Sequence, residues 1–309
     1  MFECVPNVSE GRNLTVLTDC AHAIEAAGAR LAHRTSDPVH NRSVFTFFGT
    51  RETVVAAALA LAQVTTARID LRVQRGAHPR SGALDVLPFV PFADATLADA
   101  VAVAREAAAR IWQACGVPSV FYAAAATSPR RAFLADVRAG EFEALVAHGR
   151  RDGAPDVGDI DVHPSAGAIA VGAREPLVAF NVVLASGDLA LAREIARTLR
   201  ERTGGLRTLR CLAVSLDTMR VQVSCNITDP RATPLYRVFG LVRTLAAQRG
   251  VRVERSELIG LIERAALGDV VAHALGIGEL SATQPSAAGI ANAQRRADSL
   301  IDIYEGTRP

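Results

Sequence analysis

Residues 177–226 read LVAFNVVLASGDLALAREIARTLRERTGGLRTLRCLAVSLDTMRVQVSCN, and this stretch carries the clearest structural pattern in the chain. It begins with an uninterrupted apolar run at 177–184, which is typical of a buried strand. A helix is expected at 189–202. Two further strands are expected at 209–216 and 220–226, joined by a tight turn at 217–219. The segment therefore predicts the order β-α-β-β.

The residues that follow complete a unit of six elements. Pro234 fits the first turn of a helix that runs to about residue 248, and residues 251–258 suit a closing strand. The resulting order, β-α-β-β-α-β, is the ferredoxin-like pattern.

The first half of the chain predicts the same order of elements. Strands are expected at 2–6, 29–35, 43–48 and 84–91, with helices at 13–27 and 52–68. A helix at 97–114 and a short strand at 118–122 come next. Residues 146–171 are rich in Gly, Asp and Pro and are expected to form a long loop of functional interest. The fold class is therefore α/β of the α+β type, with two ferredoxin-like βαββαβ subdomains.

Composition excludes several kinds of chemistry. The chain has 309 residues and a formal net charge of +2, which is too close to balance for a strong attraction to polyanions. All 34 basic residues are Arg. Without Lys there is no Schiff-base lysine, no P-loop lysine and no kinase strand lysine. Aromatic residues make up only 5% of the chain, so nucleic-acid binding by base stacking is poorly supported.

Cysteine usage and the N-terminus indicate the compartment. The 5 Cys include no C-x-x-C pair, so neither a disulfide framework nor a cysteine zinc site is expected. No basic region precedes an apolar run at the N-terminus, and no apolar stretch reaches the roughly 20 residues that cross a bilayer. We expect a soluble, cytoplasmic protein.

Three polar loops could carry chemistry, and each contains a histidine: His40 in the loop 37–42, His78 in the loop 75–82, and His163 in the loop 159–165. The second loop is the most informative. Gly76 and Gly82 bracket a histidine that precedes a proline and has arginines on both sides. Glycine permits close approach of a ligand to the backbone, arginine pairs with carboxylates, and histidine exchanges protons near neutral pH.

The sequence gives less support to a metal site, a serine hydrolase site or a dinucleotide site. The three histidines could bind a metal together, although their spacing matches no common metal motif. No G-x-S-x-G elbow indicates a serine hydrolase, and no G-x-G-x-x-G follows a strand as a dinucleotide site requires.

Four motifs in order resemble the glutamate formiminotransferase family, which also forms the formiminotransferase part of formiminotransferase-cyclodeaminase. They are residues 3–12 (ECVPNVSEGR) with 41–47 (NRSVFTF), residues 78–86 (HPRSGALDV), residues 158–174 (GDIDVHPSAGAIAVGAR), and residues 177–181 (LVAFN). The resemblance covers residues 1 to about 275.

The resemblance implies transfer of a formimino group from N-formimino-L-glutamate to N5 of tetrahydrofolate, which acts as co-substrate, with no metal. The products would be 5-formiminotetrahydrofolate and L-glutamate, late in histidine degradation. The family's catalytic histidine falls on His78, which we expect to act as general acid and base. Its folate-binding stretch falls on ten consecutive residues: Gly158, Asp159, Ile160, Asp161, Val162, His163, Pro164, Ser165, Ala166 and Gly167.

The substrate carries two carboxylates, and three arginines are candidates to bind them: Arg42, Arg75 and Arg80. Asn41 is expected to orient the substrate. Asp85 could orient His78 or neutralise the amidinium, or it could simply begin a strand. The family often has Trp where this chain has Ala166, so one stacking contact with the pterin is expected to be missing.

The resemblance also implies an architecture. It predicts an N-terminal subdomain at 1–175 and a C-terminal subdomain at 176–280, with a central cleft between them. A C-terminal extension at 281–309 would contain an exposed helix at 291–303. The chain is expected to be a stand-alone transferase and a homodimer. Two alternatives remain open: formyl transfer from N-formylglutamate, and a folate-binding protein without turnover.

Overall fold

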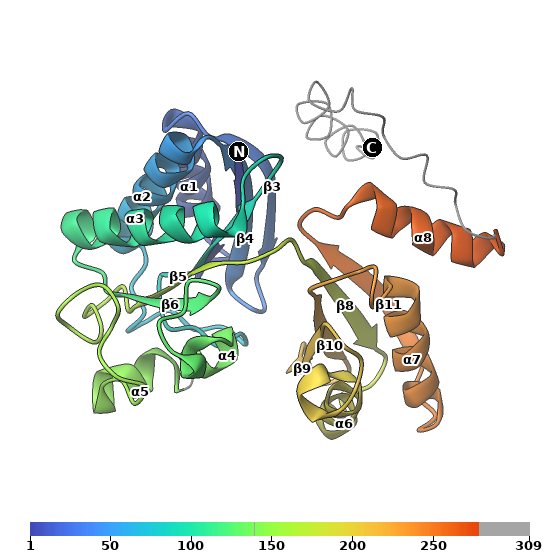
Figure 1. The fold of residues 1–309 in the computed structure, drawn as a ribbon. Coiled ribbons are helices and arrows are strands. Elements are labelled where there is room, and N and C mark those ends of the chain that lie inside the picture. The colour runs from blue at the N-terminus through green and yellow to red at the C-terminus, as the bar shows by residue number, and fades with distance from the viewer. Residues whose placement is uncertain (139, 278–309) are drawn as a thin grey trace. The chain divides into compact units, whose positions relative to one another are not determined.

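A computed structural model describes residues 1–138 and 140–277 of the chain. The chain divides into two compact units between Glu175 and Pro176 (Figure 1). The extension predicted at 281–309, with its helix at 291–303, lies outside the described residues.

The first unit is built on a mixed β-sheet. Its strands are β1 (Phe2–Cys4), β2 (Asn7–Val8), β3 (Arg30–Asp37), β4 (Arg42–Gly49), β5 (Leu84–Pro91), β6 (Ser119–Ala123) and β7 (Ile169–Ala173). Both β1 and β2 lie between β4 and β5 and pair antiparallel with each. Strand β3 pairs with β4 at one side, while β7 and then β6 continue the sheet beyond β5 in parallel.

The single strand predicted at 2–6 is therefore two short strands. The interruption lies at Val5 and Pro6, and proline has no N–H to donate to a neighbouring strand. The carbonyl of Pro6 still accepts a hydrogen bond from the backbone N–H of Phe45, 3.0 Å away.

Three helices cover one face of this sheet, as Figure 1 shows: α1 (Leu14–Ala26), α2 (Arg51–Arg68) and α3 (Leu97–Cys115). Each begins at a side-chain cap: Asn13, Thr50 and Thr96 accept from backbone N–H groups of their first turns. All three were predicted: α1 from the helical spacing of its apolar residues, and α2 because an apolar, Ala-rich stretch of that length favours a helix over a strand.

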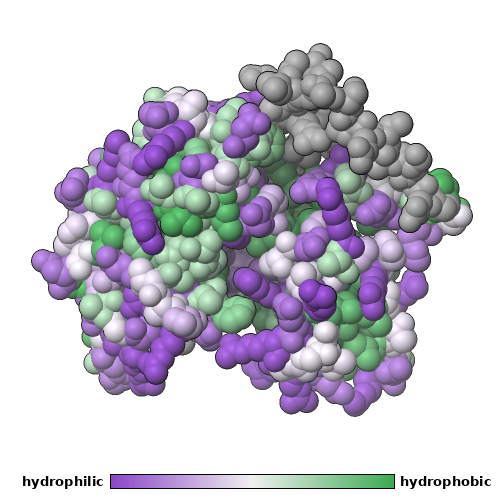
Figure 2. All heavy atoms as spheres, viewed as in Figure 1, coloured by the Kyte–Doolittle hydropathy of each residue, from purple (hydrophilic) through white to green (hydrophobic). Residues whose placement is uncertain are grey.

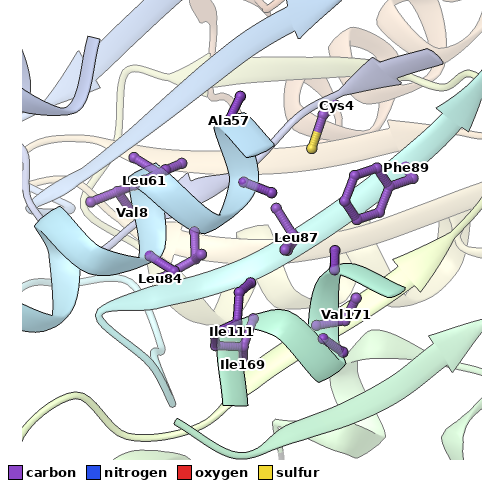
Figure 3. Close-up of a cluster of buried hydrophobic side chains, with 14 of the residues drawn as sticks. Cys4, Val8, Ala57, Leu61, Leu84, Leu87, Phe89, Ile111, Ile169 and Val171 are labelled. Atoms are coloured by element: carbon purple, nitrogen blue, oxygen red, sulfur yellow. The ribbon is translucent and has the colours of Figure 1, made fainter. Parts of the chain in front are cut away.

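The main core of the first unit lies between these helices and the sheet (Figure 3). Leu87 and Phe89 of β5 point towards the helices, together with Ile169 and Val171 of β7. The alternate residues of the same strands, such as Val86 and Ala170, form a smaller cluster on the opposite face. The short helix α4 (Leu134–Val137) packs on that second face against β6.

The segment expected as a long loop contains more structure than its composition suggested. The 3-10 turn η1 (Pro129–Arg131) and helix α5 (Glu141–His148) precede it, and α5 extends into it. Strand β7 occupies its end. The prediction missed β7 because its sequence, IAVGA, consists mostly of small residues that give no strand signal. Gly172 has to be small, because a Cβ at this position would collide with the ring of Tyr122.

The second unit follows the predicted order of elements. Strands β8 (Val178–Leu184), β9 (Leu209–Ser215), β10 (Val221–Ile227) and β11 (Val253–Ile259) form an antiparallel sheet in the order β11-β8-β10-β9. Helices α6 (Leu189–Leu199) and α7 (Leu235–Ala247) alternate with the strands as expected, and the 3-10 turn η2 (Glu201–Thr203) follows α6. The hydrophobic core contains residues of the sheet and of both helices.

Helix α8 (Arg264–Leu275) was not predicted, since Gly268 lies within it and glycine weakens a helical pattern. The two sheets share one spatial order. In the first unit β3, β4, β1/β2 and β5 lie side by side, and β9, β10, β8 and β11 correspond to them in the second.

The surface shows the mixture expected of a globular chain. On the face seen in Figure 2, hydrophilic residues surround small groups of apolar ones. None of the helices within residues 1–138 and 140–277 is both long enough and apolar enough to span a bilayer.

Candidate active site

Four loops of the first unit come together, and we call them the loop cluster: residues 9–13, 37–42, 70–83 and 163–167. They follow β2, join β3 to β4, join α2 to β5, and precede β7. The cluster contains all three histidines that the sequence singled out. Backbone hydrogen bonds hold the loops to one another.

The loop of His78 pairs with the loop of His163 through the main chain. The N–H of Ala83 donates to the carbonyl of Ala166 at 2.8 Å, and the N–H of Ala168 donates to the carbonyl of Ser81 at 2.9 Å. Gly167 has φ +77°, and a Cβ there would collide with the Ser81 carbonyl. Only glycine suits such a position, because of both the backbone angle and the close approach.

The loop of His40 pairs with the loop of His78 in a similar way. The N–H of Ala77 donates to the carbonyl of Val39 at 3.1 Å. Asn41 joins three loops: its Nδ2 donates to the carbonyl of Arg75 at 3.0 Å, and its Oδ1 accepts from the N–H of Gly11 at 2.9 Å. The amide that was expected to orient substrate therefore orients the loops.

A buried group of three charges lies beside the loop cluster, and we call it the Arg42–Asp85–Arg138 triad. Oδ2 of Asp85 accepts from Nη1 of Arg42 at 2.7 Å and from Nη1 of Arg138 at 2.8 Å. Oδ1 of Asp85 accepts from the backbone N–H groups of Ser81 and Gly82 at 2.7 and 3.2 Å. Burial alone would raise the pKa of the Asp85 carboxyl, but the two guanidinium groups outweigh it and hold the pKa well below its usual range.

The two arginines reach Asp85 from different elements. Arg42 begins β4 and lies opposite Phe45 and Phe47 in the alternation of that strand, away from helices α1–α3. Its Nε and Nη2 also donate to Oδ1 of Asn7, at 3.2 and 3.0 Å. Arg138 is the residue that ends α4.

His78 is half-buried and has a defined tautomer. Its Nδ1 lies 2.7 Å from the carbonyl oxygen of Pro79. A carbonyl can only accept, so Nδ1 carries the proton and Nε2 of the neutral ring carries a lone pair. Burial, followed by the positive charges of Arg42 and Arg138, lowers the pKa of His78 to about 2. At neutral pH the ring is therefore uncharged, with a lone pair on Nε2, and it is a weak base as long as those positive charges act on it.

The other two histidines differ from His78. The ring of His40 lies 5.8 Å from the ring of His78, centroid to centroid, and its Nε2 is buried without a hydrogen-bond partner among the described residues. Nδ1 of His163 accepts from the N–H groups of Ser165 and Ala166 at 3.3 and 3.0 Å, so this ring closes its own turn. Within residues 1–138 and 140–277, no three Cys, His, Asp or Glu side chains gather as a metal site would need.

Arg80 is buried and its donors are engaged. Nη1 and Nη2 donate to the two carboxylate oxygens of Glu143, each at 2.7 Å, and Nε donates to Oε1 of Gln74 at 2.9 Å. Nη2 also reaches the backbone carbonyls of Leu71 and Gln74. This geometry supports a role in holding the loop and does not support the expected role in receiving a substrate carboxylate.

Arg75 is exposed, and its guanidinium donates to three backbone carbonyls of its own loop, those of Leu71, Arg72 and Gln74. Asp85 makes no hydrogen bond to His78; its partners are those of the triad and two N–H groups.

The stretch 158–167, predicted to bind folate, is only partly exposed. Asp159, Ile160 and Pro164 are exposed, whereas Val162 packs against the main core and Ala166 is 1% exposed within it. Oδ2 of Asp161 accepts from the N–H of Arg150 at 3.1 Å.

At the start of the stretch, Gly158 has φ +108°, and a Cβ there would press on the ring of Trp112 at 3.1 Å.

Sequence reasoning missed four residues of this region: Asn7, Gln74, Arg138 and Glu143. Asn7 lies inside a motif that had been noted as a whole, so position within a motif could have found it. Arg138 and Glu143 had no local signal, because nothing in the surrounding sequence separates Arg138 from the chain's other arginines. Only the fold brings α4 and α5 beside the loop of His78.

Comparison with known proteins gives two kinds of match. Residues 1–174 match the family described as "Formiminotransferase domain, N-terminal subdomain", and residues 179–282 match "Formiminotransferase domain". The chain is 41% identical to the glutamate formimidoyltransferase of Streptococcus pyogenes over 278 residues, which cover 89% of this chain and 93% of that protein.

Two further relatives extend the comparison. The chain is 39% identical to the glutamate formimidoyltransferase of Thermoplasma acidophilum, over 89% of this chain and 92% of that protein. It is 37% identical to the formimidoyltransferase-cyclodeaminase of Rattus norvegicus, over 88% of this chain and 52% of that protein.

Proposed function

This chain belongs to the formiminotransferase family and is a transferase, and from that premise we propose that it moves a formimino group from N-formimino-L-glutamate to N5 of tetrahydrofolate. The observation that carries the proposal is the state of His78. Its ring is neutral, its Nε2 holds the lone pair, and its loop is bonded to the stretch that is expected to bind folate.

The proposed reaction needs one group that first takes a proton and then returns it. N5 of tetrahydrofolate attacks the amidine carbon and forms a tetrahedral intermediate. Nε2 of His78 accepts the proton that N5 loses. The same proton then passes to the glutamate nitrogen as its bond to carbon breaks. The products are 5-formiminotetrahydrofolate and L-glutamate, and His78 ends in its starting state. Such a group typically contributes about 10²–10⁴-fold in rate.

We further propose how the other predicted residues serve the reaction. Residues 158–167 present the folate, with Asp159, Ile160 and Pro164 as the exposed residues of the stretch. Arg42 and Arg75 remain candidates for the acidic substrate. Asn41 and Arg80 hold the loops in register. Asp85 holds the two arginines of the triad and the N–H groups beside His78.

The test uses the purified protein, tetrahydrofolate and N-formimino-L-glutamate, with glutamate release and product mass as readouts. Release that requires both substrates supports the proposal. Turnover with N-formylglutamate in place of the formimino donor would assign formyl transfer instead. Tight binding of a reduced folate without turnover of either donor would assign a binding protein.

Two family expectations belong with this proposal. A role in histidine degradation predicts that cells lacking the protein accumulate N-formimino-L-glutamate when they are fed histidine. A homodimer predicts twice the chain mass in light scattering at micromolar concentration.

A further inference from the structure

The Arg42–Asp85–Arg138 triad contains two positive charges and one negative charge. Asp85 is fully buried, and the side chains of Arg42 and Arg138 are 8% and 13% exposed. The other carboxylates near the loop cluster have partners of their own: Glu143 pairs with Arg80, Asp70 pairs with Arg72, and Glu10 and Asp37 accept from backbone N–H groups of their own loops. One positive charge therefore stays in excess in a place poor in water, which is costly unless an anion arrives.

Arg138 also has a hydrogen-bond donor that is not satisfied within the described residues. Its Nη1 binds Asp85, but its Nε is buried and has no hydrogen-bond partner among residues 1–138 and 140–277. A buried guanidinium normally has its donors satisfied. Ser81 Oγ, in the loop between His78 and Asp85, is likewise buried without a partner in the described part of the chain. Unsatisfied donors beside an excess positive charge indicate an anion-binding position.

The position adjoins the loop of His78, because Oδ1 of Asp85 accepts from the backbone N–H groups of Ser81 and Gly82, and the charges of Arg42, Arg138 and Asp85 act on the ring of His78. The ring of His40 is its other ionisable neighbour. In the proposed reaction His78 exchanges a proton with the nitrogen that leaves with glutamate. One carboxylate of the donor, the α-carboxylate, is separated from that nitrogen by a single carbon.

We propose that Arg138, together with Arg42, binds the α-carboxylate of the donor, and that this carboxylate is what allows His78 to hold the transferred proton. The inference rests on the proposed function and deepens it. Without the donor, the excess positive charge opposes a second positive charge on His78. With the α-carboxylate bound, the three charges of the triad and the carboxylate sum to zero. The acid form of His78 then becomes accessible only when a donor is present to receive the proton.

The first test is kinetic and compares Arg138→Gln with Arg138→Lys and with a control, Arg72→Gln. Arg72 is an exposed arginine of the loop 70–83 that pairs with Asp70. Loss of hydrogen bonds to a charged group raises KM for the donor in Arg138→Gln by roughly 10- to 100-fold. KM for tetrahydrofolate stays within twofold, Arg138→Lys lies between wild type and Arg138→Gln, and Arg72→Gln is unchanged. An Arg138→Gln protein that is folded by circular dichroism and has wild-type KM for the donor overturns the inference.

The second test does not depend on turnover. The ring of His78 is followed by NMR as pH is varied, with assignment through His78→Gln. Saturating L-glutamate, or L-glutamine, which keeps the α-carboxylate, raises the pKa of His78 in wild type towards the neutral range. Isoglutamine, in which an amide replaces the α-carboxylate, leaves the pKa of His78 unchanged. In Arg138→Gln the pKa is already raised without ligand, because one cation is gone. A shift with isoglutamine and none with glutamine assigns the γ-carboxylate and overturns our assignment.

The two tests separate the failure of the inference from the failure of the proposed function. If wild type turns over no formimino donor but L-glutamine still shifts His78, the carboxylate site stands and the reaction is wrong. If wild type turns over the donor but neither KM nor the pKa of His78 responds to Arg138, the reaction stands and the site is wrong.

Discussion

At the scale of single residues, the proposed reaction depends on the neutral ring of His78. Replacing it in His78→Ala removes the only proton carrier that we place at the reacting nitrogen. We expect kcat to fall by at least about 100-fold, with the thermal midpoint and the binding of a reduced folate kept. Single-turnover kinetics measure the loss of rate, and equilibrium binding measures whether the reduced folate still binds. Near-normal kcat in the variant would assign the proton to another group.

The proton affinity of His78 also couples stability to pH. The folded state binds a proton on His78 only near pH 2, whereas an unfolded histidine does so near roughly 6.5. Between these values the unfolded chain holds more protons, so stability falls as pH is lowered below 6.5. Wild type should lose up to about 1.4 kcal/mol per pH unit more than His78→Ala does.

Urea titrations of the two proteins at pH 6.5, 5.5 and 4.5 measure that difference. Equal slopes would mean that His78 titrates alike in the folded and unfolded chains.

Arg80 is expected to contribute to the stability of the folded protein. Truncation in Arg80→Ala removes the donors to the Glu143 carboxylate and to Oε1 of Gln74, and it leaves the carbonyls of Leu71 and Gln74 with only their hydrogen bonds from Arg75. We expect the free energy of unfolding to fall by about 2–4 kcal/mol. Glu143→Gln, at a half-exposed carboxylate, should cost less than 1 kcal/mol by the usual worth of exposed ion pairs (about 0–1 kcal/mol). Denaturant unfolding measures both, and a stable Arg80→Ala protein with a raised KM for the donor would restore its expected role in binding.

At the scale of elements, the frame of the site depends on main-chain contacts between loops. Gly167 and Gly204 both have positive φ, +77° and +89°, but only Gly167 is pressed against another loop. An alanine at Gly204 meets no atom and bears only the backbone strain of about 1 kcal/mol. An alanine at Gly167 must also push away the Ser81 carbonyl. We expect Gly167→Ala to lose activity and at least twice the stability that Gly204→Ala loses.

Thermal unfolding and turnover of the two glycine variants check this expectation. Equal losses in both would show that backbone angle alone sets the requirement at Gly167.

The elements could largely be predicted, whereas their assembly could not. Helix α1 could be recognised from the helical spacing of its apolar residues, and strand β8 from its uninterrupted apolar run. Strand β7 escaped notice, since small residues pack against Tyr122 and leave no strong pattern. The loops could be singled out by His40, His78 and His163. Their joining by backbone N–H and C=O groups is invisible in a sequence, since every residue except proline carries both groups.

The Arg42–Asp85–Arg138 triad could not be predicted from the sequence either. Arg42 and Asp85 lie in noted motifs, but Arg138 comes from α4, some 50 residues away from Asp85 in the chain. A buried charge can be recognised only from what surrounds it.

At the scale of the whole molecule, each unit has its own hydrophobic core. All four loops of the cluster and the whole triad belong to residues 1–175. We therefore expect a chain cut after Glu175 to fold alone and to keep the low pKa of His78. Circular dichroism and an NMR titration of His78 test this, with the full chain as control. A cut chain that fails to fold would show that the second unit is needed for stability.

The main-chain bonding of the loops has a consequence for protein engineering. Ile160 and Asp159 are exposed, and the bonds that join the loops do not use their side chains. Because we propose that residues 158–167 present the folate, a combinatorial library at these two positions is expected to vary the contacts with the pterin while leaving the scaffold intact. Selection from such a library for growth on a synthetic one-carbon carrier could then yield variants that accept a new carrier on the same scaffold.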